Sequence, residues 1–408
     1  MSHCFGKIRR FRFNLPQRIA AVLLALFLAQ GFWIASRQSM TERDYQYARC
    51  GREIWERPAT LFSGSTSCGN LSDGILAYRL AGLPLTAEVL LERALDPFRQ
   101  PENRVVLAGS APGAPSIPSI WELRHQLPCT LLLLRLPFLL AGCALGGGLW
   151  WVTRRLYGNF GGYTALTLYC FSPAMLSACL SPNSEILAAL GLYGGIYTSI
   201  GVAHAMQGPQ RKWRPRIVLL TVVFAIAAGA HLAALALAAL LGLAFMLWIA
   251  IGRRRPILPV VLAATAGALL LLFACCGFSP LAFGELFRLP TEFPAFSADA
   301  ARRFFLSPAN IATTIAAIAG LALYLASRRS RYFGNTVPLL CALLLFCLIL
   351  PGVNSTPWLW ALPFLFTFIA GLAADAYESP RGKLALAAGA AIVLLQVISC
   401  VLDLPKSA

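Results

Sequence analysis

Carboxylate side chains gather in one stretch of this sequence. Ten of its seventeen Asp and Glu residues lie between Glu42 and Glu122, the only long polar stretch of an otherwise apolar chain. Acids that face a membrane more often do chemistry than packing. A carboxylate held just outside a span can act as general base for an acceptor hydroxyl. We therefore predict Asp44 and Glu42, directly after the first apolar segment, as catalytic residues; the alternative is a solvated turn after a helix.

Three neighbouring side chains fit a binding role beside these acids. Arg43 lies between them and can keep a carboxylate ionised or meet an anionic substrate. Tyr45 and Tyr47 offer the aromatic faces that sugar sites need, although tyrosines also anchor helices at the membrane interface. All three are predicted as substrate-binding residues.

A second polar group lies in the very short turn from Ser181 to Glu185, between two apolar segments. Pro, Asn and Ser are ordinary turn residues, and Glu185 could equally be an acid in the first turn of a helix. The functional interpretation makes Asn183 and Glu185 a second, substrate-binding wall of the Asp44 pocket. Arg135 begins another apolar segment, where it either extends its charged end to the interface or faces a lipid phosphate.

Arginines in a later polar loop are the third group of candidates. Arg288, Arg302 and Arg303 belong to residues 277–308, and Arg suits bidentate phosphate binding. Arg302 and Arg303 also directly precede an apolar segment, so anchoring at the membrane surface explains them equally well. We predict a substrate-binding role for the three.

Cysteines and histidines give no metal-binding pattern. The twelve cysteines are scattered, mostly inside apolar segments, and no Cys-x-x-Cys pair or Cys/His ligand spacing occurs. The residues leave open whether a divalent metal takes part. Cys50 and Cys68 share the long polar stretch, so a disulfide between them is expected if this stretch faces an oxidising compartment.

Composition defines the class of protein. Hydrophobic residues make up 58% and charged residues 12% of the 408 residues, against roughly 25% charged residues in soluble domains. An all-α, polytopic integral membrane protein is therefore predicted. The net charge of +17 lies in short basic clusters between apolar segments, as membrane topology produces. No basic face or RNA-binding motif accompanies this charge, which argues against nucleic-acid binding.

Apolar segments near the ~20 residues that cross the hydrocarbon core predict eleven transmembrane helices. They are expected at roughly 19–36, 134–152, 161–179, 185–205, 216–230, 232–251, 256–276, 309–327, 337–351, 358–374 and 384–402. The stretch 216–251 is too long for one span, so a tight turn is expected at Gly229 to His231.

Basic clusters give the orientation. They lie before the first predicted span and after every second span that follows, so all of them are on the same face of the membrane. The positive-inside rule makes this face cytoplasmic. The N-terminal arm, residues 1–18, is then cytoplasmic and the C-terminus is outside. The outer face carries two larger loops, 37–133 and 277–308. No soluble domain or repeat is evident, so residues 1–408 are predicted to form one integral membrane unit.

The first outer loop has helical patterns of its own. Residues 84–99 show helical spacing, with Thr86 as cap. The apolar stretch 120–134 carries a few polar residues and is predicted to be an interfacial helix that leads into the second span.

Several motifs recur in a particular order. An acid with nearby tyrosines follows the first span, from Asp44 to Arg49. An Arg-Leu-Pro motif leads into Arg-Arg-Leu-Tyr-Gly between Arg135 and Gly162, and Ser172-Pro173 precedes the turn with Glu185. This order resembles the GT-C glycosyltransferases, particularly the polyprenyl-phosphate-sugar-dependent membrane transferases that include protein O-mannosyltransferases and lipid A aminoarabinose transferase. The resemblance covers most of residues 19–250.

The resemblance implies a GT-C-like fold and a sugar donor on a polyprenyl phosphate, used at the periplasmic face of a bacterial inner membrane. An acceptor hydroxyl, on an unknown acceptor, would attack the anomeric carbon with inversion. Asp44 would be the base, and arginines would stabilise charge on the leaving phosphate. The alternative is a non-enzymatic protein, either for translocation of lipid-linked glycans or a degenerate relative that binds lipid. It rests on Glu42-Arg43-Asp44, where the family has an adjacent Asp-Glu pair.

Overall fold

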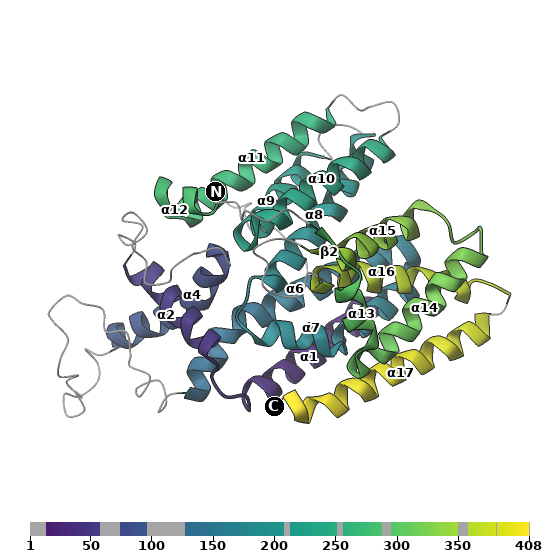
Figure 1. Cartoon of the computed structure of the whole chain (residues 1–408), viewed down its shortest axis with the longest axis horizontal. Helices are drawn as coiled ribbons and strands as arrows, with labels where there is room; N and C mark the ends of the chain where they lie inside the picture. Colours follow the sequence, from purple (N-terminus) through teal and green to yellow (C-terminus); the bar gives the residue numbers. More distant parts are fainter. Residues whose placement is uncertain are drawn as a thin grey trace, which may run out of the picture.

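The computed structural model shows a chain that is mainly α-helical (Figure 1). It describes residues 14–57, 74–95, 127–207, 213–250, 256–287, 295–349, 358–380 and 382–407. The helices are α1 (Leu15–Ala35), α2 (Glu42–Glu56), α4 (Ile75–Leu95), α6 (Leu127–Cys170), α7 (Pro173–Leu180), α8 (Glu185–Met206), α9 (Arg214–Ala230), α10 (Leu232–Ile249), α11 (Ile257–Cys275), α12 (Pro280–Glu285), α13 (Asp299–Leu306), the 3-10 turn η5 (Pro308–Asn310), α14 (Ile311–Ala326), α15 (Phe333–Cys347), α16 (Trp358–Tyr377) and α17 (Gly382–Ser407). Two short strands, β1 (Ala295–Phe296) and β2 (Leu348–Ile349), pair antiparallel.

Long apolar helices dominate the described residues. Seven of these helices are long and apolar enough to cross a membrane, and they correspond to α1, α6, α8, α10, α11, α14 and α16. Shorter apolar helices lie in α15 and α17. A helix that is apolar all round is either buried or spans a membrane, because it offers no polar face to water. The predicted all-α polytopic membrane fold is confirmed.

Each of the eleven predicted spans falls on a helix, and the second and third are the two halves of α6. The two halves meet at a kink at Gly158, where φ is 74°, a backbone region that favours glycine. They lie side by side, since the Tyr169 hydroxyl donates to the Gly142 carbonyl at 2.6 Å. The helical path of the third span then breaks at Phe171, and Ser172 caps α7. The tight turn predicted between the fifth and sixth spans is confirmed, since α9 ends at Ala230 and His231, with an extended backbone, leads into α10.

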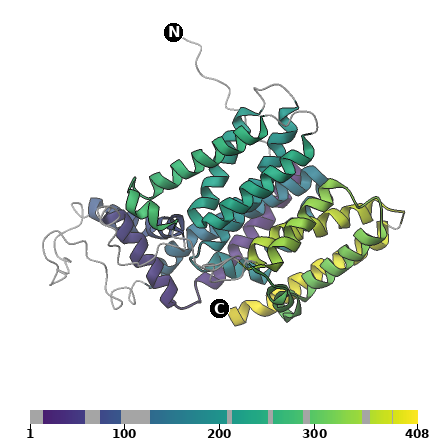
Figure 2. The same cartoon turned by 45° about the horizontal axis from the view of Figure 1, so that its top comes forward.

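The centre of the bundle is α16. Every residue from Leu359 to Leu372 is buried, and α16 packs against α6, α8 and α15. A hydrogen bond of 3.0 Å between the hydroxyls of Tyr193 and Thr367 joins α8 to α16 inside this core. The helices α14 to α17 group together on one side of the molecule, whereas α9 to α11 lie on another (Figure 2).

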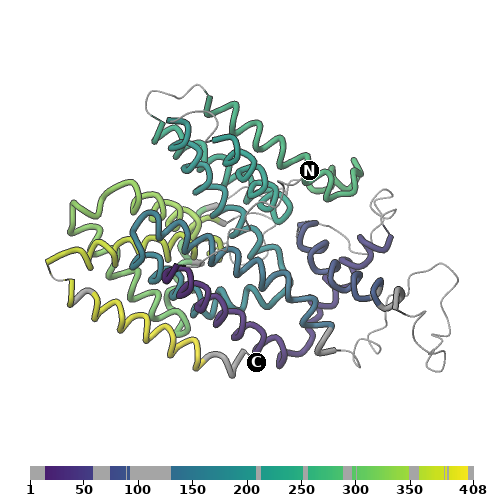
Figure 3. Tube along the Cα trace, turned by 180° about the vertical axis from the view of Figure 1, so that it is seen from behind, coloured from purple at the N-terminus to yellow at the C-terminus, as the bar shows by residue number. Residues whose placement is uncertain are grey.

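The stretch predicted as the first outer loop, residues 37–133, contains two described helices, α2 and α4, that stand at one end of the bundle (Figures 1 and 3). The helix α2 has no counterpart among the sequence-based predictions. The predicted helix start at residue 84 is wrong, because α4 begins at Ile75 and carries Pro84 inside it. Tyr78 and Ala81 of its first half are buried, so packing against α2 extends the helix.

The predicted interfacial helix over 120–134 is, from Leu127 onward, the first part of α6. Leu131 and Leu134 are buried there, so this part packs into the protein. Residues 120–126 lie outside the described part of the chain.

The two helices of the outer loop touch through their backbones. A Cβ atom on Gly82 of α4 would overlap backbone atoms of Gly51 in α2, and the reverse also holds. Only glycine permits this approach, because backbone cannot move aside as a flexible side chain can.

We expect Gly82→Val to separate α2 from α4 and to lower the free energy of unfolding by at least ~1–3 kcal/mol, the usual range for overpacking. Thermal unfolding of the purified protein in detergent measures this effect. Gly148→Val is the matched control, because nothing lies within 4 Å of a Cβ at Gly148. Equal melting temperatures for both variants would contradict the close packing of α2 on α4.

Candidate active site

Asp44 is a buried carboxylate in the first turn of α2. Thr41 precedes the helix as N-cap and its hydroxyl accepts from the Asp44 backbone amide at 3.1 Å. In return, Asp44 Oδ2 accepts from the Thr41 backbone amide at 3.0 Å and from the Thr41 hydroxyl at 2.9 Å. This reciprocal arrangement is a capping box, which satisfies amides that the first turn of a helix leaves unpaired. The box fixes the carboxylate, whose residue is 1% exposed.

Arg135 of α6 pairs with this carboxylate. Its Nη2 lies 2.7 Å from Asp44 Oδ2, and both side chains are almost completely buried. The chain between α1 and α2 surrounds the guanidinium, which also donates to the Gln38 side chain at 3.3 Å and to the Ser39 carbonyl at 3.4 Å. The charged end of Arg135 is therefore directed into the protein, toward Asp44, and does not extend along the outside of α6 to the membrane surface.

The two oxygens of Asp44 differ in what they contact. The bonds from Thr41 and from Arg135 all end on Oδ2, and none of the hydrogen bonds within the described residues ends on Oδ1. A buried charge pair is costly unless its geometry is good and further hydrogen bonds support it. Here Thr41, Gln38 and Ser39 supply such bonds, whereas Arg135 Nε is buried without a partner among the described residues. The arrangement orients a carboxylate by one oxygen and leaves the other for a proton.

The predicted neighbours of Asp44 divide into inner and outer residues. Tyr47 is fully buried, stacks on Tyr78 with 4.5 Å between ring centroids, and lies edge-on to Phe138. Its ring therefore packs α2 against α4 and α6. Glu42 and Arg43 are exposed on the first turn of α2 and Tyr45 is half-buried. These three residues therefore lie on the outward side of the first turn of α2.

Glu185 is the centre of a second buried group, at the first turn of α8. Its Oε2 accepts a 2.6 Å hydrogen bond from the indole Nε1 of Trp360 in α16. Its Oε1 lies 3.9 Å from Nε2 of His231, the residue between α9 and α10. Asn183 Oδ1 accepts from the Glu185 backbone amide at 3.1 Å, and the Ser184 hydroxyl lies 2.8 Å from the His231 ring.

The two groups have neighbours in common. The helix α6 packs against both α2 and α8, and α4 packs against both α2 and α9. Gly74, just before α4, has φ 89° and lies against the carbonyls of Gly229 and Ala230, next to His231. The start of α4 thus connects the outer loop to the turn that carries His231.

Trp360, His231 and Ser184 are members of this group that the sequence analysis does not place in the site. Trp360 lies in an apolar segment and looks like a membrane residue there, and His231 has no partner at ligand spacing in the sequence. A histidine in a tight turn between two apolar helices is the one signal that points toward the group.

We expect Trp360→Phe to lower the free energy of unfolding by roughly 1.5–3 kcal/mol, the range for a hydrogen bond to a charged group. The substitution keeps an aromatic ring in the core but removes the donor to the buried Glu185 carboxylate. The control is Trp248→Phe, since Trp248 is exposed. If the melting temperatures of the two variants match, the indole bond does not stabilise the fold.

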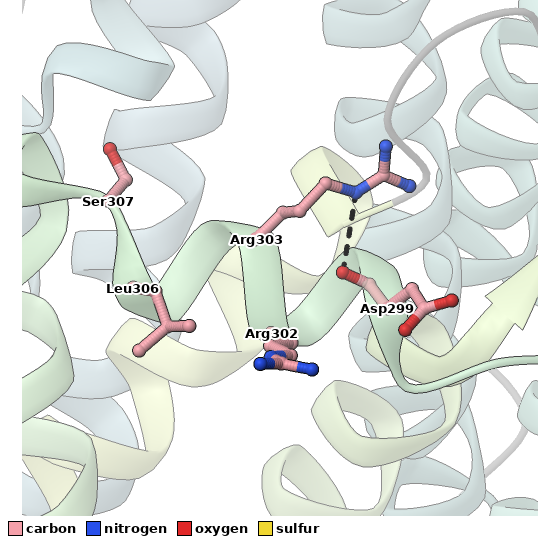
Figure 4. A pocket seen from close by; sticks show the side chains of 5 residues that line it. All are labelled: Asp299, Arg302, Arg303, Leu306 and Ser307. Atoms are coloured by element: carbon pink, nitrogen blue, oxygen red, sulfur yellow. Dashed lines mark hydrogen bonds between the residues drawn. The ribbon is translucent and has the colours of Figure 1, made fainter.

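The predicted arginines of the later loop fall into two classes. Arg288 lies outside the described residues. Arg302 and Arg303 are on α13, where they line a pocket of about 630 Å³ (Figure 4). The helix α13 packs against α14, α15 and α16, whereas α2 lies beyond α6 and α7 in the view of Figure 1. The structure thus brings Arg135 to Asp44 and gives Arg302 and Arg303 a pocket of their own.

Among the described residues, no group of three or more His, Cys, Asp or Glu side chains is arranged to hold a metal ion. Cys50 of α2 is disulfide-bonded. Cys68, the partner that the sequence predicts, lies outside the described residues.

Known structures share this fold. No protein-family model and no curated protein sequence matches the chain. Crystal structures of ArnT from Cupriavidus metallidurans do, one in the apo state and one bound to undecaprenyl phosphate. The TM-scores are 0.55 and 0.53, with 16% identical residues in both comparisons.

The matches cover 92% of this chain but only 63% and 62% of the ArnT chains, so this chain spans less than two thirds of their length. At this identity the likeness establishes the fold, which is GT-C-like as the motifs predicted.

Proposed function

We propose that this chain is an inverting glycosyltransferase that moves a sugar from a polyprenyl-phosphate donor to an acceptor hydroxyl at the periplasmic face of a bacterial inner membrane. The observation that carries the proposal is the Asp44–Arg135 pair, a buried carboxylate held through Oδ2 with Oδ1 left over. The GT-C-like fold supports it, and one ArnT structure of that fold is bound to undecaprenyl phosphate.

The chemistry follows from this geometry. The acceptor hydroxyl attacks the anomeric carbon while Asp44 Oδ1 takes its proton, and the bond from that carbon to the lipid phosphate breaks on the opposite side. A general base of this kind contributes about 10²–10⁴-fold to a rate. Glu42, Arg43 and Tyr45, the outward-facing residues of α2, bind the sugar and its phosphate. Arg135 holds Oδ2 of the base at 2.7 Å and so acts as a positioning residue.

The same proposal assigns Glu185 and Asn183 to the opposite wall of the substrate site, with Tyr47 on the inner face of α2, where it packs against α4 and α6. Glu185 is held by Trp360 from α16, so its carboxylate keeps one position as substrate enters. A divalent metal is compatible with the reaction class.

The topology belongs to the proposal as well. Basic clusters on one face make the N-terminus cytoplasmic and the C-terminus periplasmic. The disulfide at Cys50 supports the outer placement of α2, because disulfides persist in the periplasm and not in the cytosol. On this face no nucleotide donor is available, which favours a lipid-linked sugar.

A specific observation favours a second candidate, a degenerate relative or translocation component that binds lipid-linked glycan without turnover. Asp44 is almost completely buried, and its Oδ2 serves the capping box of α2. A residue with that environment can be retained for folding alone.

Reconstituted wild-type protein separates these candidates. Proteoliposomes are supplied with polyprenyl-phosphate donors that carry radiolabelled pentose, aminopentose or hexose, together with extracted envelope glycolipids and proteins as acceptors. The proposal expects transfer of label to an acceptor and release of polyprenyl phosphate. Saturable donor binding with no release of polyprenyl phosphate, for every donor and acceptor fraction, would establish the non-enzymatic candidate instead.

A further inference from the structure

The helix α13 is fixed against the core by one face. Phe304 is 3% exposed, and its ring lies 4.9 Å from that of Trp358 and 5.4 Å from that of Phe346, measured between centroids. Just before the helix, the Ser297 amide donates to the Cys347 carbonyl at 2.8 Å, next to the β1–β2 pair. These contacts decide which face of α13 is turned outward.

The outward face lines the pocket shown in Figure 4. Its members recur at the spacing of one helix face and are Asp299, Arg302, Arg303, Leu306 and Ser307. The volume of about 630 Å³ is within the roughly 300–1,000 Å³ of small-molecule sites.

Both arginines of this face keep most of their donors for a ligand. Arg303 Nε donates to the Asp299 carbonyl at 3.4 Å. Arg302 makes no side-chain hydrogen bond or ion pair with the described residues, and both arginines are exposed. Against the single carboxylate of Asp299, two guanidinium groups leave net positive charge, which suits an anion with several oxygens.

Apolar surface adjoins this charge on the membrane side. Leu306 is 71% and Phe296 is 70% exposed. A candidate membrane span begins at Pro308, directly after the pocket residue Ser307. Along α14, exposed Ile311, Ile315 and Ile318 continue one apolar face. The pocket therefore lies where a membrane changes from headgroups to hydrocarbon.

We infer that the α13 pocket binds the phosphate headgroup of an anionic membrane lipid, with Arg302 and Arg303 on the phosphate and Leu306 beside the acyl chains. Arginines at this depth attract anionic headgroups, whereas a soluble anion gains nothing from the apolar surface. The site has different neighbours from the Asp44 group, and its occupation does not depend on the proposed transfer reaction.

Native mass spectrometry of the full chain in neutral detergent tests the inference with three probes. These are dioctanoyl phosphatidic acid, dioctanoylglycerol, which has the same chains without phosphate, and inorganic phosphate. Phosphatidic acid is expected to bind at least about tenfold more tightly than either other probe, since only it has both chemical parts. If inorganic phosphate bound as tightly as phosphatidic acid, the pocket would be a simple anion site and the inference of a lipid site would be wrong.

The double variant Arg302→Gln/Arg303→Gln is expected to bind phosphatidic acid about 10- to 30-fold more weakly. Arg214→Gln/Arg328→Gln is the matched control, because it removes two exposed arginines at other helix ends. Equal weakening in both double variants, or none in the first, would overturn the inference. Leu306→Ser should weaken the binding of phosphatidic acid and leave the binding of inorganic phosphate unchanged. Unchanged phosphate binding would exclude a folding defect in this variant. Lipid binding by wild-type protein that transfers no sugar would contradict the proposed function alone.

Discussion

Asp44→Asn is expected to reduce sugar transfer by about 10²–10⁴-fold, the contribution of a general base. The amide fills the same space and can still accept from Thr41, but it cannot take the proton of the acceptor hydroxyl. Transfer of radiolabelled sugar by the reconstituted variant measures the loss. The dissociation constant of the donor should change little, because the proposed donor contacts are on other residues.

Thr41→Ala separates the catalytic role of Asp44 from its role in the capping box. Loss of an N-cap costs about 1 kcal/mol, but the Arg135 bond to Asp44 Oδ2 is independent of Thr41. We expect a lower melting temperature with transfer largely retained. If Thr41→Ala lost as much activity as Asp44→Asn at equal stability, the carboxylate would be structural and its assignment as base would fall.

Arg135→Gln is expected to cost ~3–5 kcal/mol of stability, because it leaves the buried Asp44 carboxylate without its charge partner. Arg135 also fixes the chain between α1 and α2 through Gln38 and Ser39, so α2 should lose its place. Chemical or thermal unfolding in detergent measures the loss. Arg43→Gln, which removes an exposed arginine beside Asp44, should stay within ~0.5 kcal/mol of wild type.

A double-mutant cycle tests the pairing itself. Asp44→Asn combined with Arg135→Gln removes both charges and should recover part of the stability that Arg135→Gln loses, because the uncompensated buried charge is gone. Transfer by the double variant should stay at least as low as in Asp44→Asn, because the base is still missing. Strictly additive stability losses would mean that the 2.7 Å contact contributes no coupling.

The fold followed from features that are local in the sequence. Apolar segments of spanning length predicted the helices, and the split at Gly229 to His231 followed from excess length. The helix α2 was missed although Thr41 and Asp44 have the three-residue offset of a capping box. Its low apolar content, in ERDYQYARCGREIWE, offered no core-facing pattern strong enough to predict it.

The candidate site was harder to predict because its contacts are distant in the sequence. Asp44 and Arg135 were both selected by type and position, but nothing local pairs residues 91 positions apart. The Trp360 bond to Glu185 joins residues 175 positions apart, and an indole in an apolar segment is indistinguishable from an interfacial anchor. Tyr47 illustrates a further difficulty: a tyrosine ring that suits a sugar also suits the core, and here it packs α2 against α4 and α6.

The position of α16 has a consequence for how the chain is assembled. Translation proceeds at about 5–20 residues per second, so Trp360 is made roughly 9–35 s after Glu185, its partner 175 residues earlier. During that interval α6 and α8 lack α16, the most buried of the candidate spans, against which they pack in the complete protein. The Glu185 carboxylate lacks its indole donor for the same time. A chain truncated before α16 would therefore keep the Glu185 carboxylate inside the bundle without its indole donor.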